Sequence, residues 1–306
     1  MTADDYRKLG EFLSWEGIDY RTGEQLSEHS SFRIGGPADL FAMPAHSYDV
    51  VKLVDYCRSR QIRFFAVGRG SNLLFDDRGF RGVVISLAMI DGIERMGDGT
   101  DIECGCGTYL GKACAYARDN GLSGMERLFG IPGSVGGAVY MNAGAYGGEI
   151  GDVCVSVEAL DSDGNTVVFD REKCGFGYRR SVFMSGDYII LSAHFDLKYG
   201  DKAEIGAEMT RVVEQRSMRQ PLNYPSAGSA FKRPEGDYAS RLIDVCGLKG
   251  LRVGGAQVSE KHAGFIINRG GATSRDVLEL IERVRNEVLR QTGIALEPEV
   301  EYLREK

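Results

Sequence analysis

Two glycine-rich segments are the first features of the sequence whose residue types and spacing suggest chemistry. The first, Gly68 to Asn72 (GRGSN), lies between two extended apolar stretches. Its glycines would let the backbone approach a ligand and turn N–H groups toward an anion, and Ser71 and Asn72 add side-chain donors. It is not a Rossmann fingerprint, because the third glycine is absent and no helix is expected after it. A tight strand connection is the alternative explanation.

The second segment, GIPGSVGGAVYMNAGAYGGEIGD at 130–152, contains eight glycines. A protein core needs side chains to fill its volume, so this segment must leave room for something else. A flat, extended ligand lying against bare backbone would suit it, and crossing loops at a domain junction are the alternative. Together, an anion-binding loop and a flat shelf fit a flavin dinucleotide better than a mononucleotide.

Seven blocks of the sequence resemble one enzyme family, the UDP-N-acetylenolpyruvoylglucosamine reductases (MurB). In chain order they are SFRIGGPA at 31–38, GRGSNLL at 68–74, GIPGSVGG at 130–137, GYRRS at 177–181, PSAGSAFK at 225–232, GGAQVSEKH at 254–262 and EPEV at 297–300. Each block alone is weak evidence, whereas seven in family order are specific. The resemblance extends over residues 30–303.

The resemblance implies an α+β fold: a two-lobed FAD-binding fold of the vanillyl-alcohol-oxidase (PCMH) type, followed by a C-terminal α/β substrate-binding lobe. We place the first FAD-binding lobe at 1–85 with the tail 300–306, the second at 86–200, and the substrate-binding lobe at 201–299. The interval between Arg179 and Ser229 holds no tyrosine-bearing insertion that would clamp a substrate, which is typical of the shorter, type II form of the family.

The resemblance also implies the activity: NADPH-dependent reduction of UDP-N-acetyl-3-O-(1-carboxyvinyl)glucosamine to UDP-N-acetylmuramate through noncovalent FAD, a cytoplasmic step of peptidoglycan synthesis. No metal is expected. The residues expected to contact FAD lie in the two glycine-rich segments and are Gly68, Arg69, Gly70, Ser71, Asn72, Leu73, Gly133, Ser134, Gly136, Gly137, Asn142, Ala143 and Gly144.

Three residues match the family's catalytic positions. Hydride addition to the vinyl C3 leaves negative charge at C2 and in the neighbouring carboxylate, and the fork of an arginine suits that charge; the family position is Arg179. C2 then needs a proton, and Ser229 matches the donor, although a serine is a poor acid and needs a relay. Glu299 matches the residue that assists polarisation of the carboxylate. Spacing alone would not distinguish Arg179 from Arg180.

The UDP end of the substrate requires cations. Lys232 directly follows the Ser229 loop and is our first choice, and Arg219 and Lys261 are further candidates. Tyr178 is expected to line the pocket. His262 is open to two interpretations, nucleotide contact or a structural hydrogen-bonded histidine, of which the second is favoured. Arg233 stands where many family members have asparagine, so the polar contact there is left open.

Apolar spacing predicts the elements that must position these residues. Helices are expected at 47–60 with Ser47 as N-cap, 108–120 with Thr108 as cap, 202–219, 237–246 and 273–292, the last ending at Gly293. Strands are expected at 63–67, 82–87, 101–106, 262–268 and in the tail, and a β-hairpin in the 160s. Residues 1–28 are expected to be a helical or irregular lead-in.

The pattern of expected elements changes near residue 200, where strand-like segments give way to a long helix. This change predicts two N-terminal lobes and a C-terminal α/β lobe. Residues 205–270 hold ten Lys or Arg and six Asp or Glu, a net charge of +4 in a chain of −7. A basic lobe on an acidic protein favours a phosphate-bearing ligand there, with a solvated surface as the even alternative.

The composition argues against several other classes of protein. The chain has 306 residues, 43% hydrophobic and 26% charged, and its net charge of −7 argues against nucleic-acid binding. No apolar run is long enough to insert into a membrane, and the acidic N-terminus is unlike a secretory signal. Seven scattered cysteines without a CxxC pair argue against a disulfide framework or a zinc ribbon and favour a reduced cytoplasmic protein.

Two competing functions stay open from sequence. One is a flavin oxidase of the same fold that uses O₂ and a small alcohol, and the basic C-terminal lobe argues against it. The other is a noncatalytic flavin or nucleotide-binding module. The sequence predicts a UDP-sugar and NADPH as partners and says nothing of partner proteins.

Overall fold

The apolar spacings that predict the long helices are confirmed by the computed structural model, which describes residues 3–304. Helix α2 spans Ser47–Ser59, α6 spans Lys202–Arg219 and α8 spans Ser274–Thr292. The regularly spaced apolar side chains of α8 are buried. Its first turn is capped by Thr273, whose Oγ1 accepts from the N–H of Asp276 at 3.1 Å, and it ends at Gly293 with φ 73°.

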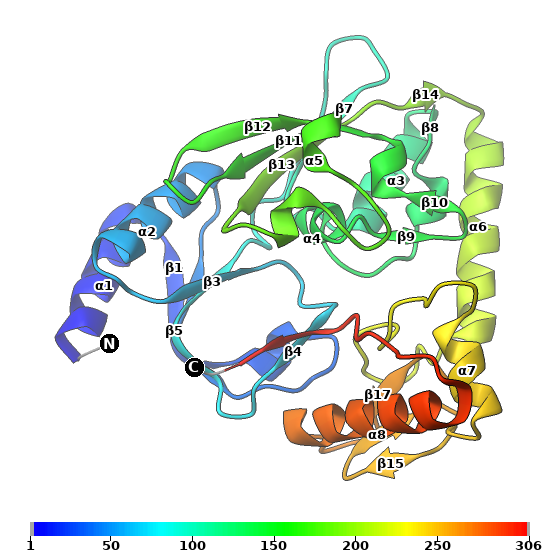
Figure 1. The fold of residues 1–306 in the computed structure, drawn as a ribbon. Coiled ribbons are helices and arrows are strands. Elements are labelled where there is room, and N and C mark those ends of the chain that lie inside the picture. The colour runs from blue at the N-terminus through cyan, green and yellow to red at the C-terminus, as the bar shows by residue number, and fades with distance from the viewer. Residues whose placement is uncertain (1–2, 305–306) are drawn as a thin grey trace. The chain divides into compact units, whose positions relative to one another are not determined.

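The described chain divides into two compact units (Figure 1). Unit 1 comprises residues 3–21, 40–69 and 82–215, and unit 2 comprises residues 22–39, 70–81 and 216–304. Each unit has its own cluster of buried apolar side chains. The three-lobe division expected from the sequence stays a prediction, and residues 1–2 and 305–306 of its first lobe lie outside the described residues.

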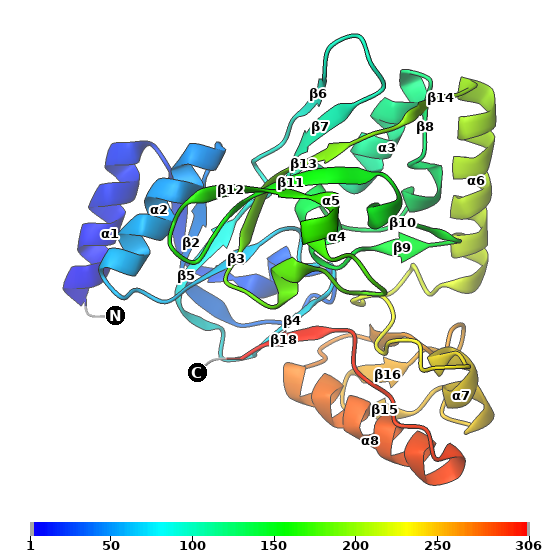
Figure 2. The same ribbon diagram turned by 45° about the horizontal axis from the view of Figure 1, so that its top comes forward.

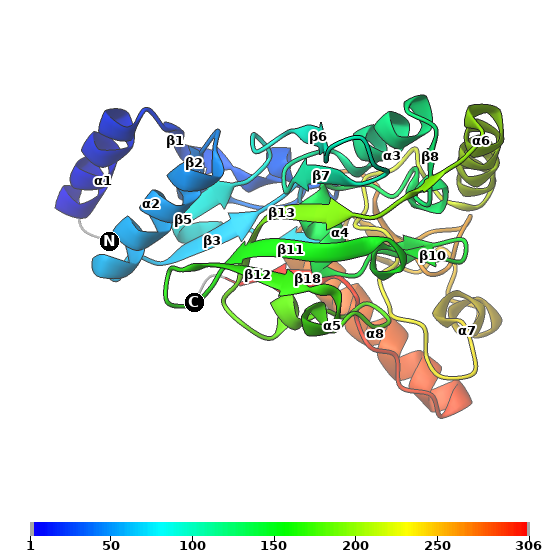
Figure 3. The ribbon, with the colours of Figure 1, turned by 90° about the horizontal axis from the view of Figure 1, so that it is seen from above.

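An antiparallel sheet of five strands dominates unit 1 (Figure 3). Its order is β12 (Thr166–Asp170), β11 (Cys154–Leu160), β13 (Ile189–Phe195), β7 (Ile102–Gly105) and β6 (Ile93–Arg95). Strands β11 and β12 form the hairpin expected in the 160s. The carboxylate of Asp161 closes its turn by accepting from the N–H groups of Asp163 and Asn165 at 2.9 and 2.8 Å.

A second sheet has the order β1 (Asp19–Gln25), β2 (Pro37–Met43), β5 (Phe80–Ser86), β3 (Phe64–Val67), with β3 and β5 parallel. The remaining elements of unit 1 are helices α1 (Ala3–Glu16), α3 (Leu110–Asp119), α4 (Val135–Tyr140) and α5 (Arg171–Cys174), the strand pairs β8 (Leu122–Ser123) with β14 (Lys198–Tyr199) and β9 (Gly144–Ala145) with β10 (Gly148–Glu149), and the 3₁₀ turns η2 (Glu126–Leu128), η3 (Ile150–Asp152) and η4 (Val182–Met184).

Unit 2 combines a small sheet, one long helix and a parallel strand pair. Strands β15 (Arg252–Val253), β16 (Ala256–Val258) and β17 (Ile266–Asn268) form the sheet, and α8 and α7 (Ala239–Val245) pack beside it (Figure 2). The C-terminal strand β18 (Glu301–Leu303) runs parallel to β4 (Leu73–Phe75), which follows the first glycine loop. The 3₁₀ turn η1 (Leu26–His29) also belongs to this unit.

Both expected caps were wrong. Helix α3 begins at Leu110, because the hydroxyl of Thr108 is engaged elsewhere: it donates to the carbonyl of Gly92 at 2.9 Å and accepts its N–H at 3.1 Å. Helix α2 is capped by His46 rather than Ser47, and Asp49 accepts the N–H of His46 at 3.2 Å.

The strand expected at 262–268 was too long. Residues 262–265 turn instead, since the N–H of Phe265 donates to the carbonyl of His262 at 3.0 Å, and only Ile266–Asn268 pairs with β16. Helix α4, inside the second glycine-rich segment, was not expected at all, because glycine disfavours helices. None of the helices within residues 3–304 combines the length and apolar composition needed to cross a bilayer.

Candidate active site

The two glycine-rich segments meet in unit 1. Ser134 caps helix α4 by accepting the N–H of Gly137 at 3.4 Å. A Cβ at Gly68 would lie 2.5 Å from the Oγ of Ser134, and a Cβ at Gly136 would lie 2.8 Å from the Cβ of Cys106. Both positions therefore need glycine so that the backbones can approach. Gly137 is exposed, with no atom nearer than 3.5 Å to a Cβ built there.

Tyr109 borders this surface and was missed by the sequence analysis. Its backbone bridges that of Ser134, and the guanidinium of Arg69 lies 5.4 Å from the centre of its ring, which is 40% exposed. An exposed aromatic ring beside an arginine is suited to stacking on a planar ligand. The only signal in the sequence was a tyrosine at the start of an expected helix, and such a residue is more often part of a core.

The first glycine loop passes from unit 1 into unit 2 after Arg69. Gly70 has φ 59°, and a Cβ there would strike the carbonyl of His29. Its own carbonyl accepts the N–H of Ser31 at 3.2 Å. The amide of Asn72 donates to the carbonyl of Glu299 at 3.0 Å, so this side chain holds the segment that carries the expected catalytic glutamate.

Several expected cofactor residues have defined roles inside the protein. Both main-chain groups of Ala143 are engaged, with Ala138 at 2.8 Å and Ile150 at 3.0 Å. A Cβ at Gly144 would lie 2.7 Å from that of Glu149, so glycine permits the β9–β10 pairing. In the surface formed by Gly68, Arg69 and residues 133–137, residues 133–136 are buried, and Gly68, Arg69 and Gly137 are at least partly exposed. Accessible glycine backbone near the exposed ring of Tyr109 fits an extended flavin dinucleotide.

Arg179 lies in a tight turn of unit 1. Gly177 and Arg180 exchange two main-chain hydrogen bonds of 3.0 Å, which leaves Tyr178 and Arg179 as the central residues. Arg179 has φ 51°, an unusual conformation for a side chain of this size. Its Nη2 donates to the carbonyl of Gly144 at 2.8 Å, and its guanidinium lies 5.2 Å from the ring of Tyr178.

Ser229 and Glu299 are brought together in unit 2. The backbone of Ser229 bridges Phe265, and the N–H of Glu299 donates to the carbonyl of Ala230 at 2.9 Å. A second bridge joins Phe231 to the residue before Glu299. Main-chain pairing thus places both residues on adjacent segments. Arg179 belongs to the other unit.

The expected UDP-binding cations all lie in unit 2, and they differ in environment. The ammonium of Lys232 pairs with Glu297 at 2.6 Å, three residues from Ser229 along the chain. Lys261 donates to the carbonyl of Ser217 at 2.6 Å, and Arg219 is exposed at the end of α6. Arg233 lies with its guanidinium 4.4 Å from the ring centre of Tyr238.

The contacts of His262 support the structural interpretation that the sequence analysis favoured. Its Nδ1 accepts the N–H of Gly264 at 3.2 Å, and its ring packs edge-on to that of Phe265. Burial lowers the pKa of the imidazole below its ordinary value of 6.5. The neutral ring can therefore keep Nδ1 as an acceptor.

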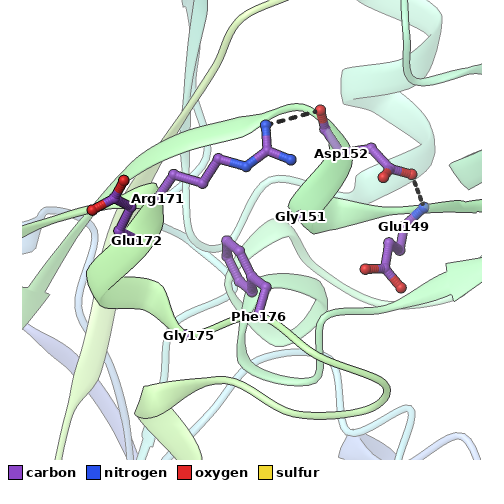
Figure 4. Close-up of a pocket in the computed structure, with 7 residues that line it drawn as sticks. All are labelled: Glu149, Gly151, Asp152, Arg171, Glu172, Gly175 and Phe176. Atoms are coloured by element: carbon purple, nitrogen blue, oxygen red, sulfur yellow. Dashed lines mark hydrogen bonds between the residues drawn. The ribbon is translucent and has the colours of Figure 1, made fainter.

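A cavity of about 460 Å³ lies in unit 1 (Figure 4). It is lined by Glu149, Gly151, Asp152, Arg171, Glu172, Gly175 and Phe176. Charged side chains of both signs surround the ring of Phe176, which directly precedes the Arg179 turn. The carbonyl of Asp152 accepts from Arg171 at 3.4 Å, and its carboxylate accepts the N–H of Glu149 at 2.8 Å.

Comparison with protein families matches most of the chain in two parts. Residues 38–170 match the model of an FAD binding domain. Residues 220–303 match the model of the UDP-N-acetylenolpyruvoylglucosamine reductase C-terminal domain. The first match includes the surface where the two glycine-rich segments meet, and the second includes Ser229 and Glu299.

Individual relatives extend the likeness to nearly the whole chain. A UDP-N-acetylenolpyruvoylglucosamine reductase from Clostridium beijerinckii is 45% identical over 296 residues, which is 97% of this chain and 96% of the relative. One from Clostridium botulinum is 44% identical over 301 residues, 98% of each. The crystal structure of the enzyme (MurB) from Thermus caldophilus has a TM-score of 0.79 and 36% identity, covering 94% of this chain and 99% of that one.

Proposed function

Because this chain belongs to the UDP-N-acetylenolpyruvoylglucosamine reductase family, it is an FAD-dependent oxidoreductase of peptidoglycan precursor synthesis, and we propose that Arg179, Ser229 and Glu299 carry its chemistry. The observation that carries the proposal is the pairing of the Ser229 and Glu299 segments in unit 2 by main-chain hydrogen bonds. A proton donor for C2 and a carboxyl group that polarises the neighbouring carboxylate must be held close together in this way.

FAD, when bound, would supply the hydride-transfer chemistry that couples NADPH to the enolpyruvyl double bond of UDP-N-acetyl-3-O-(1-carboxyvinyl)glucosamine. The surface formed by Gly68, Arg69 and residues 133–137 is where we propose that it is held. Tyr109 and Arg69 would bind one of its planar parts, and the N–H groups of the glycine segments would bind its phosphates. We propose that binding is noncovalent, as the family resemblance implies.

Arg179 binds the substrate carboxylate and stabilises the negative charge that spreads into it when C3 receives hydride. Its guanidinium already donates to a neutral carbonyl, that of Gly144, at 2.8 Å. A carboxylate is a stronger acceptor than a carbonyl, so substrate exchanges a neutral hydrogen bond for a charge-assisted one. Stabilisation of developing charge by a prepositioned donor is the largest contribution that the protein makes in such reactions.

Ser229 donates the proton that C2 needs to complete UDP-N-acetylmuramate. A hydroxyl is a weak acid, so the role requires a strongly basic C2 and a route by which the hydroxyl is reprotonated. Glu299, held on the adjacent segment, assists by polarising the substrate carboxylate. Main-chain pairing fixes the backbone from which both side chains project.

The basic residues of unit 2 are proposed to receive the UDP group. Lys232 is the first choice because its ammonium lies three residues from Ser229 and its ion pair with Glu297 is exposed on the glutamate side. An exposed pair is weak and yields readily to a diphosphate. Arg219, Lys261 and Tyr178 are proposed as further contacts.

The enzyme is proposed to act in the cytoplasm, where UDP-sugars and NADPH are found and where thiols stay reduced. All seven cysteines are free, and burial raises the pKa of those at 57, 104, 106 and 154 to about 12. Thiols that stay protonated in this way are unreactive, which agrees with a packing role.

The two half-reactions, measured separately without oxygen, test this function. NADPH should bleach the visible flavin absorbance of the purified holoenzyme, and the enolpyruvyl nucleotide should restore it. If a small alcohol bleaches the flavin instead of NADPH, and O₂ restores its absorbance instead of the enolpyruvyl nucleotide, the protein is a flavin oxidase. A preparation that binds no FAD when supplied with an excess would refute the proposal.

A further inference from the structure

Asn142, which the sequence analysis placed among the FAD contacts, is the residue outside the proposed catalytic set that the structure connects most closely to that set. Its side chain is completely buried, with 0% exposure, between the end of helix α4 and the Arg179 turn. The amide Nδ2 donates to the carbonyl of Gly177 at 2.9 Å, and Oδ1 accepts the N–H of Gly151 at 2.8 Å. The side chain thus uses both ends of its amide inside the protein.

We propose that Asn142 is a positioning residue for Arg179, which fixes the turn of residues 177–180 so that the guanidinium meets the substrate carboxylate. The inference rests on the proposed role of Arg179. The carbonyl of Gly177 is also the acceptor of the hydrogen bond that closes the turn, from Arg180 at 3.0 Å. Asn142 therefore holds the turn at its first residue, through the same carbonyl that closes it.

Three ties join residues 140–144 to residues 177–181, and they differ in what happens when substrate binds. The Asn142 amide holds Gly177, the hydroxyl of Ser181 donates to the carbonyl of Tyr140 at 2.6 Å, and Arg179 itself donates to Gly144. Only the last tie uses the guanidinium that the substrate needs. The other two keep the turn in place after Arg179 has changed its partner.

Asparagine also suits the backbone at this position. Asn142 has φ 42°, in the left-handed region, where asparagine is tolerated better than most residues. Its second partner, Gly151, leaves no room for a larger residue: a Cβ there would lie 3.0 Å from the Cβ of Phe176 and 3.2 Å from Oδ1 of Asn142. Gly151 and Phe176 also line the cavity of Figure 4, so one wall of the cavity and the base of the turn are one packed unit.

Asn142→Asp tests the proposal with little change in shape. The carboxylate keeps the bond from Gly151, loses the bond to Gly177 and places its charge against a carbonyl oxygen. We expect FAD content and flavin reduction by NADPH to change less than about threefold, and reoxidation by the enolpyruvyl nucleotide to slow by about 30- to 100-fold, because small misplacements of a catalytic group have such effects.

Asn120→Asp is the matched control. Asn120 also donates its amide to a main-chain carbonyl, that of Tyr116 at 2.9 Å, at the end of α3 in the same unit. The control should leave both half-reactions unchanged. If it slows reoxidation as much as Asn142→Asp does, the effect is a general consequence of lost amide bonds and the proposal is overturned.

A double-mutant cycle separates positioning from stability. If Asn142 acts through Arg179, then adding Asn142→Asp to Arg179→Ala should cost less than about twofold further in reoxidation. Full additivity of the two effects would overturn the proposal. If Arg179→Ala alone leaves reoxidation intact, it is the proposed function of Arg179 that fails, which is a different outcome.

Asn142→Gly keeps the experiment decisive if the aspartate variant does not fold, because glycine accepts φ 42° while removing both amide bonds. Calorimetric titration of the oxidised holoenzyme with UDP-N-acetylmuramate supplies a readout besides turnover. Affinity should fall at least fivefold in either Asn142 variant and stay unchanged in Asn120→Asp. Loss of FAD with product affinity retained would overturn the proposal and make Asn142 a cofactor-binding residue.

Discussion

The Arg179 turn in unit 1 and the Ser229–Glu299 pair in unit 2 are positioned by different means. The turn is held to its neighbours by side chains: the amide of Asn142, the hydroxyl of Ser181 and the guanidinium of Arg179 itself. The pair is held mainly by its main chain, through the bridge of Ser229 to Phe265 and the bond from Glu299 to Ala230, with one side-chain bond from the amide of Asn72 to the carbonyl of Glu299.

The difference determines which substitutions each region tolerates. Where side chains make the ties, a change that preserves the backbone can still release a catalytic group. Where the main chain makes most of them, fewer side chains outside the catalytic ones matter directly, and most other changes act by altering backbone conformation. The four predictions below test this contrast.

The largest effect is expected for Ser229→Ala in unit 2. Removal of the hydroxyl leaves the main-chain pairing intact, so the fold and flavin reduction by NADPH should be unchanged. Reoxidation by the enolpyruvyl nucleotide should slow by about 10²- to 10⁴-fold, the usual contribution of a general acid. Rapid-mixing measurement of each half-reaction checks this, and equal slowing of both halves would contradict the proton-donor role.

Arg179→Lys should have the next largest effect. Lysine keeps the positive charge but lacks the planar fork that binds a carboxylate with two hydrogen bonds. We expect reoxidation to slow by about 10²- to 10³-fold. Arg180→Lys, next to it in the same turn, is the control and should change neither half-reaction. An equal loss in the two variants would show that the turn, and not the guanidinium of Arg179, is what the reaction needs.

The sequence was sufficient for the long helices and for the hairpin of unit 1. Helix α8 was predictable because its apolar residues recur at helical spacing between a Thr273 cap and Gly293, and the β11–β12 hairpin because turn residues separate two strand-like runs. Membership of the family followed from seven motifs, each carrying a local backbone requirement. These are properties of short segments, which sequence patterns describe well.

The contacts between distant segments could not be predicted in this way. Asn142 and Gly177 are 35 residues apart, and nothing in either segment indicates that one holds the other. Helix α4 was not predictable because Gly136 serves close packing against Cys106, a contact that the sequence does not indicate. The division into two units was also not predictable, since four of the five points where the chain passes between them lie inside β1, β2, β5 and α6, and the fifth lies in the first glycine loop.

Gly228→Ala should have a moderate effect, by changing backbone conformation next to Ser229. Gly228 has φ 75° and open space around a Cβ, so alanine adds strain without a collision. We expect unfolding to become easier by about 1–2 kcal/mol and reoxidation to slow roughly tenfold. Gly247→Ala, with φ 70° and equally open space, is the matched control in unit 2. It should lose the same stability, measured by denaturant unfolding, and no activity.

The smallest effect is expected for the carboxylate of Asp76 in unit 2, and it concerns the pH dependence of stability. Asp76 is 4% exposed, and its carboxylate accepts from Arg78 at 2.9 Å and from the hydroxyl of Tyr302 in β18 at 2.7 Å. The hydrogen bonds from Arg78 are the main cause that holds the pKa of Asp76 well below its usual range. The stability that this charge contributes is therefore complete above the unfolded-state pKa of about 4 and is lost as pH falls further.

Asp76→Asn should lower the free energy of unfolding by about 1–3 kcal/mol at neutral pH, because hydrogen bonds to a charged group are replaced by neutral ones. The difference from the wild type should narrow as pH falls below about 4. Glu282→Gln, which removes an exposed pair with Arg285 on α8, is the control and should be neutral at every pH. The amide tie of Asn142 does not titrate, so Asn142→Gly should lose the same stability at pH 4 as at pH 7. A loss that varied with pH for Asn142→Gly, or that did not vary for Asp76→Asn, would remove the difference between a neutral amide in unit 1 and a charged carboxylate in unit 2.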